Sequence, residues 1–524
     1  MKKVILFLFI SFLSLANPYA DQAKRVTIYR DQWGIPHIYG KTDADAVFGL
    51  LYAQCEDDFA RVEMNYIEKL GRMSEVKGEK ELAYDLYIKL LIDEKEAKEE
   101  YKTSPLWLKK LLNAYADGIN YYLQKHPEVK PRLITHFEPW FPLLWTDGSI
   151  GAISTGDVTE QETALFYGLP AQVASVKYQN PDEKLTGSNG FAVGPALSKS
   201  GNSLLYINPH VTFYFRPEVH VESEEGLSVY GAVTWGQFFI YQGFNPYNGW
   251  MHTSSEVDVA DAYIETTRSR AGQMEYLLDG KWIPFKTKWI TLGNRKIKTY
   301  YNHRGPVLAA RNGKWISVRS YNRARKSLVQ SWLRTKTTGF ADFKRVMEMR
   351  ANTSNNTVYA DNKGNIAYWH GNYVPRRNPT LDWGIPQDGS TSNNDWRGLH
   401  HLDEIVHSYN PASAWIQNCN STAFTVAGPS SPLRTNYPVY MSPDGENFRD
   451  RNAVRLFSQT SKLDLSGLIG LGYDRRLMAF EVLIPALLEA ITSEADLKEV
   501  ANELKKWDYN ASVTSIAQTI AVRW

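Results

Sequence analysis

The chain has 524 residues, of which 43% are hydrophobic and 22% are charged, a composition typical of a globular protein that excludes a largely disordered one. Its formal net charge of +2 gives no electrostatic basis for binding nucleic acid, so we expect no nucleic-acid partner. Only two cysteines occur, Cys55 and Cys419, which excludes a disulfide-rich scaffold and leaves open whether the two pair.

The first twenty residues have the pattern of a secretory signal peptide. Lys2 and Lys3 precede an apolar run at residues 4–15, and small residues follow it. We expect cleavage after Ala20, with Ala16 as the alternative. The run is too short to span a bilayer comfortably, and no other stretch of the sequence approaches about 18 uninterrupted apolar residues. The sequence therefore predicts a secreted or periplasmic protein with no membrane partner.

The next elements are two strands followed by helices. Residues 26–39 predict strand, turn and strand, and a helical pattern runs from there to about residue 125. Ser104 and Pro105 are typical of the N-cap and the first position of a helix, and apolar residues then recur at helical spacing from Leu108 to Tyr122.

The residue pattern of the sequence changes at Leu185. Short β-rich segments punctuated by Gly, Pro and Asn continue to about residue 420, and a helical pattern returns from Phe448. A helical first third, a β-rich middle and further helices predict an α+β protein built of layers.

The stretch LTGSNGFAVG at residues 185–194 opens the β-rich region. Asn189-Gly190 is a typical hairpin dipeptide between two apolar runs, and turn chemistry alone explains it. That interpretation gives no role to the small hydroxyl residue Ser188, which stands behind Gly187 at the edge of the predicted strand. These ten residues do not decide between a turn and a functional serine.

Seven short motifs follow one another along the chain, and their order favours the functional serine over the simple turn. They are WGIPHIYG at 33–40, GSNGFAVG at 187–194, NPH at 208–210, WMHTSSEVDVAD at 250–261, YADNKGNIAY at 359–368, NPASAWIQNCNST at 410–422 and FRDRNAVR at 448–455. In order and spacing they resemble the penicillin acylase family of N-terminal-nucleophile hydrolases, and within it the acyl-homoserine-lactone and aculeacin acylases. The resemblance runs from about residue 26 to the last residue.

The resemblance implies the four-layer αββα sandwich of that family. It also implies three parts: the signal peptide at residues 1–20, a helical α-chain segment with a spacer peptide at 21–187, and a β-chain segment at 188–524. The two chains would stay together after processing. Members of the family usually continue past the point where this sequence stops, so an incomplete sandwich at the C-terminus is one expectation.

In this family the precursor cuts itself at a Gly-Ser bond, and the resemblance implies that this bond is Gly187-Ser188 and that Ser188 is the nucleophile. The chemistry is physically sound. A serine hydroxyl is a weak nucleophile that needs an adjacent base. A free α-amino group has a pKa of roughly 7.7–8.0 and is therefore largely available as a base near neutral pH. A serine that begins a chain carries this base itself.

The resemblance also assigns supporting roles. The side chain of Asn420 and the backbone N–H of Ser254 match the donors that hold the oxyanion, each worth on the order of 3–4 kcal/mol. His210 stands where the family places His or Gln beside the nucleophile, and Arg449 matches an arginine near the pocket. Asn418 lies in the same motif as Asn420 and is the alternative if the register slips.

A structural calcium ion is a further expectation from the resemblance. Asp258 and Asp261, with the carbonyl of Ala260 between them, suit an ion that prefers oxygen ligands, and Glu160 matches a fourth ligand from the N-terminal segment. The competing interpretation is a solvated acidic loop. No organic cofactor is expected.

The sequence thus predicts a self-processing amidohydrolase that cleaves the amide between an acyl group and an amine through a Ser188 acyl-enzyme. Its partner would be a small N-acyl compound, with acyl-homoserine lactones or related aliphatic amides ranked ahead of penicillins. The aromatic run Phe213-Tyr214-Phe215 suits the wall of either kind of pocket. The alternative is a non-catalytic remnant, or a subunit that needs a second polypeptide.

Overall fold

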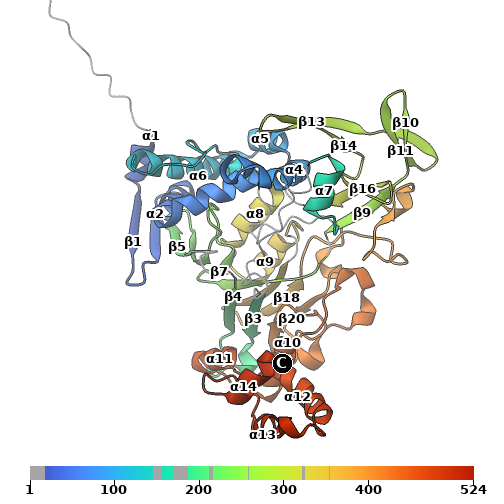
Figure 1. The fold of residues 1–524 in the computed structure, drawn as a ribbon. Helices are drawn as coiled ribbons and strands as arrows, with labels where there is room; N and C mark the ends of the chain where they lie inside the picture. Colours follow the sequence, from blue (N-terminus) through green and yellow to red (C-terminus); the bar gives the residue numbers. More distant parts are fainter. Residues whose placement is uncertain are drawn as a thin grey trace, which may run out of the picture.

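The computed structural model describes residues 18–144, 156–169, 187–211, 216–257, 259–321, 325–352 and 355–524. Two β-sheets lie face to face, and helices cover the outer face of each (Figure 1). The predicted α+β class and the αββα layering are therefore confirmed.

The first helical layer is built on α2 (Asp43–Lys69) and α6 (Leu106–Lys125), which pack against each other. Thr42 caps α2 through a reciprocal pair of hydrogen bonds with Asp45, which explains why the helix begins there. The N-cap predicted for α6 is wrong by one residue. Pro105 is the N-cap, and Ser104 instead donates its hydroxyl to the carbonyl of Glu100 at 2.6 Å.

A nine-stranded sheet lies beneath these helices. Its order is β1 (Val26–Arg30), β2 (Pro36–Gly40), β5 (Glu218–Ser223), β6 (Ser228–Ala232), β7 (Gln242–Phe244), β8 (Asn248–Ser254), β17 (Asn355–Asp361), β18 (Ile366–His370) and β20 (His407–Tyr409). The pair β2–β5 is parallel and the other pairs are antiparallel. The predicted strands within 26–39 are β1 and β2.

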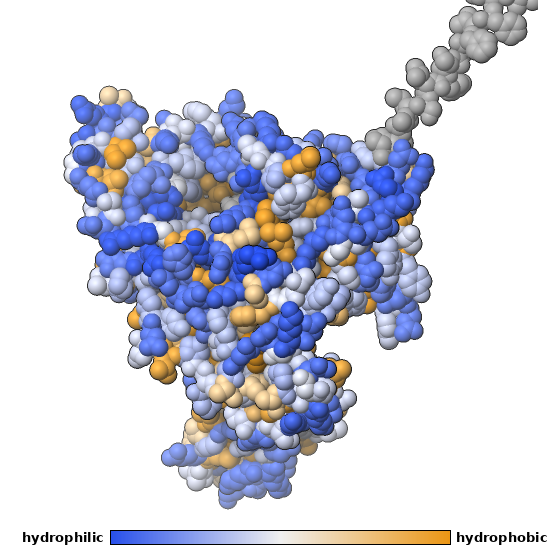
Figure 2. All heavy atoms as spheres, turned by 180° about the vertical axis from the view of Figure 1, so that it is seen from behind, coloured by the Kyte–Doolittle hydropathy of each residue, from blue (hydrophilic) through white to orange (hydrophobic). Residues whose placement is uncertain are grey.

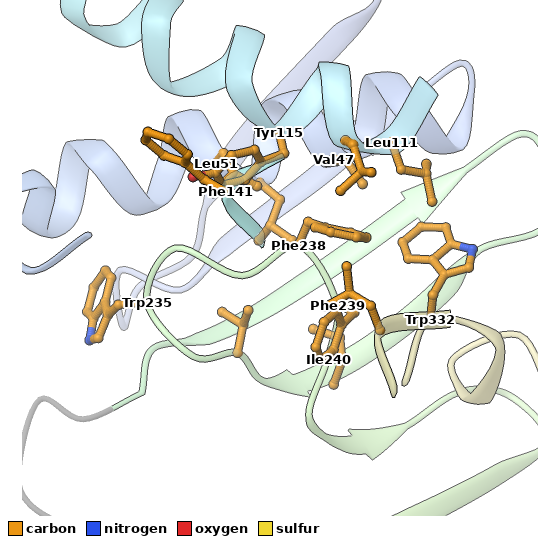
Figure 3. Close-up of a cluster of buried hydrophobic side chains, with 14 of the residues drawn as sticks. Val47, Leu51, Leu111, Tyr115, Phe141, Trp235, Phe238, Phe239, Ile240 and Trp332 are labelled. Atoms are coloured by element: carbon orange, nitrogen blue, oxygen red, sulfur yellow. The ribbon is translucent and has the colours of Figure 1, made fainter. Parts of the chain in front are cut away.

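The largest core fills the space between this sheet and its helices. Figure 3 shows side chains of α2 and α6 meeting the loop that carries Phe238, Phe239 and Ile240. Two further helices, α8 (Arg325–Arg334) and α9 (Phe340–Met347), contribute Trp332 and Phe343 to the same cluster. Burial of these aliphatic and aromatic side chains stabilises the contact between the helical layer and the sheet.

The second sheet has three antiparallel strands in the order β21 (Trp415–Asn418), β3 (Gly187–Val193) and β4 (Leu204–His210). The hairpin interpretation of Asn189-Gly190 is therefore wrong, because both residues lie inside β3. Gly190 is needed for packing: a Cβ atom there would lie 2.9 Å from the side chain of Met251 on β8.

The two faces of β3 are buried in different layers. Ala192 packs between the two sheets with Met251 and Val358, whereas Phe191 and Val193 pack toward helices. Those helices are α10 (Phe448–Gln459) and α11 (Leu465–Gly472), which cover β21 and β4. Side chains alternate along a strand, so Ser188 shares the inner face with Gly190 and Ala192.

The remaining elements surround this sandwich. The other strands are β9 (Ala260–Glu265), β10 (Thr267–Arg270), β11 (Gln273–Leu278), β12 (Lys281–Pro284), β13 (Lys286–Leu292), β14 (Arg295–Tyr301), β15 (Val307–Arg311), β16 (Lys314–Ser320) and β19 (Gln387–Asp388). The other helices are α1 (Pro18–Ala23), α3 (Ser74–Lys77), α4 (Leu82–Leu91), α5 (Glu94–Lys102), α7 (Glu160–Phe166), α12 (Met478–Ala490), α13 (Lys498–Lys506) and α14 (Ile516–Arg523). Cys55 and Cys419 are both buried and free.

The predicted signal peptide lies largely outside the described residues, which begin at Pro18, and α1 spans the position after Ala20 where we expect cleavage. Within the described part of the chain, no helix has both the length and the apolar character needed to cross a membrane.

The contact between α2 and α6 depends on a glycine. A Cβ atom at Gly118 would lie 2.4 Å from the carbonyl oxygen of Phe48. We expect Gly118→Ala to lower the free energy of unfolding by about 1–3 kcal/mol, as overpacking typically does, measured by urea denaturation. Gly470 is the matched control, since it lies in α11 with no atom within 4 Å of its Cβ position. Gly470→Ala should be neutral or stabilising by up to about 1 kcal/mol, and equal effects of the two changes would contradict the packing described here.

Candidate active site around Ser188

The Gly187-Ser188 bond lies at the start of β3, beside the end of β4. The antiparallel register pairs Gly187 with His210 and Ser188 with Pro209. Ser188 is only 5% exposed. The folded chain thus holds this peptide bond in a defined environment inside the sandwich.

The side chains of Asn420 and Arg449 form hydrogen bonds with the backbone N–H and the carbonyl of Ser188. Its N–H donates to Oδ1 of Asn420 at 2.6 Å, and its carbonyl oxygen accepts from Nη1 of Arg449 at 3.2 Å. The strand partner Pro209 has no N–H to offer to that carbonyl. The orientation of Ser188 is therefore set by residues from the C-terminal part of the chain.

The hydroxyl of Ser188 points back at the preceding residue. Its Oγ donates to the carbonyl oxygen of Gly187 at 2.7 Å. A Cβ atom at residue 187 would lie 2.9 Å from Oδ1 of Asn420 and 3.2 Å from both Nη2 of Arg449 and Nδ1 of His210. Glycine thus permits the predicted site residues to close around the peptide bond.

Asn420 occupies a turn that suits asparagine. Its φ of +56° is in the left-handed region, which asparagine tolerates better than most residues. Besides Ser188, its Oδ1 accepts from Nη2 of Arg449 at 3.0 Å, and its Nδ2 donates to the carbonyl of Ser254 at 3.0 Å. Ser254, at the end of β8, is thereby brought to the same cluster.

Asn418 has a different environment. It is fully buried, and its Oδ1 accepts from Thr253, from Asn356 and from the backbone N–H of Asn420. Its amide therefore supports the turn that presents Asn420, while Asn420 itself contacts Ser188.

Asn447 is a positioning residue that the sequence analysis missed. As the N-cap of α10, its Oδ1 accepts from the backbone N–H groups of Arg449 and Asp450, both at 3.0 Å. Its Nδ2 donates to the carbonyls of Cys419 and Asn420 at 2.9 and 3.0 Å. One side chain thus ties the start of α10 to the turn that carries Asn420. The asparagine directly before the helical FRDRNAVR pattern is the N-cap signal that would have identified it.

Comparison with known proteins identifies the family to which the chain belongs. A family model described as penicillin amidase matches residues 25–524. The chain belongs to the penicillin amidase family. Among relatives, it is 23% identical to acyl-homoserine lactone acylase QuiP of Pseudomonas fluorescens Pf-5, over 93% of this chain and 66% of that protein. It is 25% identical to acyl-homoserine lactone acylase PvdQ of Pseudomonas fluorescens Pf0-1, over 93% of this chain and 71% of that protein.

The chain therefore spans about two thirds of the length of these relatives. Among solved structures, it resembles the thermostable penicillin G acylase from Alcaligenes faecalis in its orthorhombic form, with a TM-score of 0.51 and 20% identity. That match covers 62% of this chain and 60% of the other, and it supports the assignment of the fold.

In this member of the penicillin amidase family, the charge near Ser188 is positive. Arg449 donates to neutral oxygens, those of the Ser188 carbonyl and of the Asn189 and Asn420 side chains. Burial lowers the pKa of His210, and the guanidinium of Arg449 lowers it further. His210 is therefore neutral near pH 7 and is suited to hydrogen bonding rather than to charge stabilisation.

Two of the residues predicted to bind calcium, Ala260 and Asp261, begin β9. Asp261 is buried, and its Oδ2 accepts from Nε of Arg377 at 2.8 Å and from the indole of Trp396. Its Oδ1 is buried without a hydrogen-bond partner among the described residues, which leaves one oxygen suited to a cation. Ala260 precedes it in β9, and Glu160 begins α7. Asp258 lies outside the described residues, so calcium stays a prediction.

Proposed function

We propose that this chain is a secreted or periplasmic, self-processing amidohydrolase that cleaves N-acyl compounds through a Ser188 acyl-enzyme. The observation that carries the proposal is the Ser188 hydroxyl, 2.7 Å from the carbonyl oxygen of the Gly187-Ser188 bond, in a cluster with Asn420, Arg449 and His210. Family membership supports the reaction class.

Processing begins in the proposed mechanism with attack of Ser188 Oγ on the carbonyl carbon of Gly187. The C–N bond breaks, the hydroxyl proton passes to the departing nitrogen, and an ester joins Gly187 to Oγ. Water then hydrolyses the ester, which leaves a carboxylate on Gly187 and restores the hydroxyl. The products are a new C-terminus and a serine with a free α-amino group.

That amino group then acts as the base for turnover. The positive charge of Arg449, bound to the carbonyl of the same residue, favours the neutral form of the amine by lowering its pKa. The amine takes the proton of Oγ as Oγ attacks the acyl carbonyl. The proton then goes to the leaving amine, and water hydrolyses the acyl-enzyme.

Asn420 and Ser254 are the proposed oxyanion donors. The Nδ2 group of Asn420 has two hydrogens, so one can remain on the Ser254 carbonyl while the other meets the oxyanion. The backbone N–H of Ser254 is the second proposed donor. Such donors act on charge that develops only during the reaction.

A groove beside Ser188 suits the acyl group. It has a volume of about 1110 Å³ and runs between β4 and the nine-stranded sheet, lined on the β4 side by Leu205, Ile207, Pro209 and Val211. Pro209 is the strand partner of Ser188, and cross-strand partners share one face of a sheet. The opposite wall includes Tyr230, Trp235 and Phe244. The run Phe213-Tyr214-Phe215 lies outside the described residues.

A structural calcium ion stays part of the proposal, held by Asp258, Asp261, Glu160 and the Ala260 carbonyl. The unpartnered Oδ1 of Asp261 supports it, and the ion would stabilise the fold without entering the reaction.

Cleavage is the first test. Mass spectrometry of protein recovered from the exported fraction should show a chain that begins at Ser188. Ser188→Ala removes the nucleophile and should leave the bond intact in a folded protein. A parent protein that folds and stays whole would exclude the self-processing enzyme and favour the non-catalytic alternative.

The role of Asn420 is tested in processed enzyme. Asn420→Ala should lower kcat roughly 10²–10³-fold, the usual loss for one oxyanion donor. Asn420→Asp is the companion variant, since aspartate also tolerates a positive φ and can still accept from Ser188 and Arg449, but offers no N–H. The two variants should lose similar activity. A loss below tenfold in both would reject this donor.

The substrate class is tested by a rate series. Because the relatives named above are acyl-homoserine lactone acylases, we expect release of homoserine lactone, with kcat/KM rising with acyl chain length until the groove is full. Each buried methylene contributes about 0.8 kcal/mol. Penicillin G is the comparison, with 6-aminopenicillanic acid as product. Faster turnover of penicillin G than of every lactone would reverse the ranking and leave the amidohydrolase assignment in place.

A further inference from the structure

A row of polar side chains crosses the nine-stranded sheet on the face that meets the second sheet. The strand registers place Thr253 of β8 opposite Asn356 of β17, and Asn356 opposite His370 of β18. All three residues are buried. Oδ1 of Asn418, at the end of β21, accepts hydrogen bonds from the side chains of Thr253 and Asn356. The row therefore reaches the turn that carries Asn420.

The backbone fixes how the amides of this row are oriented. The N–H of Asn420 donates to Oδ1 of Asn418 at 3.1 Å, and Nδ2 of Asn418 donates to the carbonyl of Ser421 at 3.0 Å. The atom of Asn356 that lies 3.2 Å from Oδ1 of Asn418 must then be the donor Nδ2. Oδ1 of Asn356 therefore faces Nδ1 of His370, at 2.8 Å. Because an amide oxygen only accepts, Nδ1 of His370 carries a hydrogen.

The other ring nitrogen of His370 faces a buried carboxyl group. Nε2 of His370 lies 3.4 Å from Oδ2 of Asp444, and neither atom has a hydrogen-bond partner among the described residues. A neutral ring with its hydrogen on Nδ1 presents a lone pair at Nε2, so this contact is favourable only with a second hydrogen between the two atoms.

Burial opposes a separate charge on either member of this pair. Burial lowers the pKa of His370 to about 4, against the opposite effect of the Met441 carbonyl. Burial also raises the pKa of Asp444, more than its bond to the N–H of Glu256 lowers it. A pair without net charge, with one proton between nitrogen and oxygen, is therefore the favoured state.

The carboxyl group of Asp444 also binds the segment after Ser254. Its Oδ1 accepts from the backbone N–H of Glu256 at 2.8 Å. The carbonyl of the next residue, Gly445, accepts from the backbone N–H of Thr422 at 2.9 Å. The loop of Asp444 thus connects the two segments that carry the proposed oxyanion donors.

We propose that Asp444 and His370 form a one-proton pair that positions the oxyanion donors Asn420 and Ser254. His370 orients Asn356, and through it the support of the turn that carries Asn420. Asp444 supplies the hydrogen between its carboxyl group and His370, and it holds the backbone after Ser254. Both are positioning residues, since neither is among the residues that line the acyl groove. Their role rests on the proposed function, because positioning matters only where the reaction takes place.

Turnover is the first test of the pair. Asp444→Leu removes both oxygens and should lower kcat at least tenfold, because a displacement of about 1 Å can cost roughly 10²-fold in rate. KM should stay within about twofold, since the acyl groove is untouched. Asp444→Asn still accepts from Glu256 and offers an N–H to His370, so its kcat should stay within about threefold of the parent. Loss of processing in folded Asp444→Leu, restored in Asp444→Asn, counts as the same result.

The matched control is another buried carboxylate. Glu265 lies at the end of β9 and binds Arg304 and Ser317. Glu265→Gln should lower Tm and leave kcat unchanged. Equal losses of kcat in Glu265→Gln and Asp444→Leu would overturn the positioning role, as would an active parent whose kcat is unchanged in Asp444→Leu. A parent that is neither processed nor active would instead reject the proposed function.

Nitrogen NMR tests the pair without any turnover. Ser188→Ala protein labelled with ¹⁵N in its histidines should show a His370 ring with a hydrogen on Nδ1. The signal is assigned by its absence from protein that also carries His370→Gln. The hydrogen on Nδ1 should persist when Asp444→Asn is added. A His370 ring without a hydrogen on Nδ1 would overturn the proposal, whatever the activity of the parent.

Discussion

The arrangement of the site depends on one oxygen atom, Oδ1 of Asn420. It accepts hydrogen bonds from the backbone N–H of Ser188 and from Nη2 of Arg449. Three segments therefore meet at this atom: the start of β3, the turn after β21 and the first turn of α10. The backbone of Asn420 has a positive φ in the turn that carries this oxygen. The side chain of Asn447 binds that turn to the start of α10. The direction of the peptide bond before Ser188 is thus set by residues more than 200 positions away in the chain.

The layers of the sandwich make that junction rigid. β3 is the middle strand of its sheet, with apolar side chains on one face buried against α10 and on the other against β8 and β17. The face of the molecule drawn in Figure 2, in contrast, is largely hydrophilic, with scattered apolar patches. Polar groups held in a packed core reorganise little when charge develops beside them. The low free-energy cost of that reorganisation is the physical basis of preorganised catalysis.

The sequence predicted much of this from periodicity and motif order. The strands within 26–39, the helices up to Lys125 and the helix from Phe448 are where the patterns place them. Two local predictions were wrong, the first because of a competing local hydrogen bond and the second because of tertiary packing. Ser104 bonds to Glu100 and does not cap α6, and Asn189-Gly190 continues a strand because Gly190 packs closely on β8. Asn447 was missed although it stands in an N-cap position, because its link to the turn of Asn420 joins residues distant in sequence.

The sequence by itself therefore determined the class of fold and the family, because these follow from local periodicity and from motifs kept in order. Only the tertiary structure decided which asparagine of the NCN motif meets Ser188 and that Arg449 neighbours its carbonyl. The physical reason is that hydrogen bonds and lone-pair contacts act over about 3 Å, and sequence spacing carries no information on such distances between separate strands.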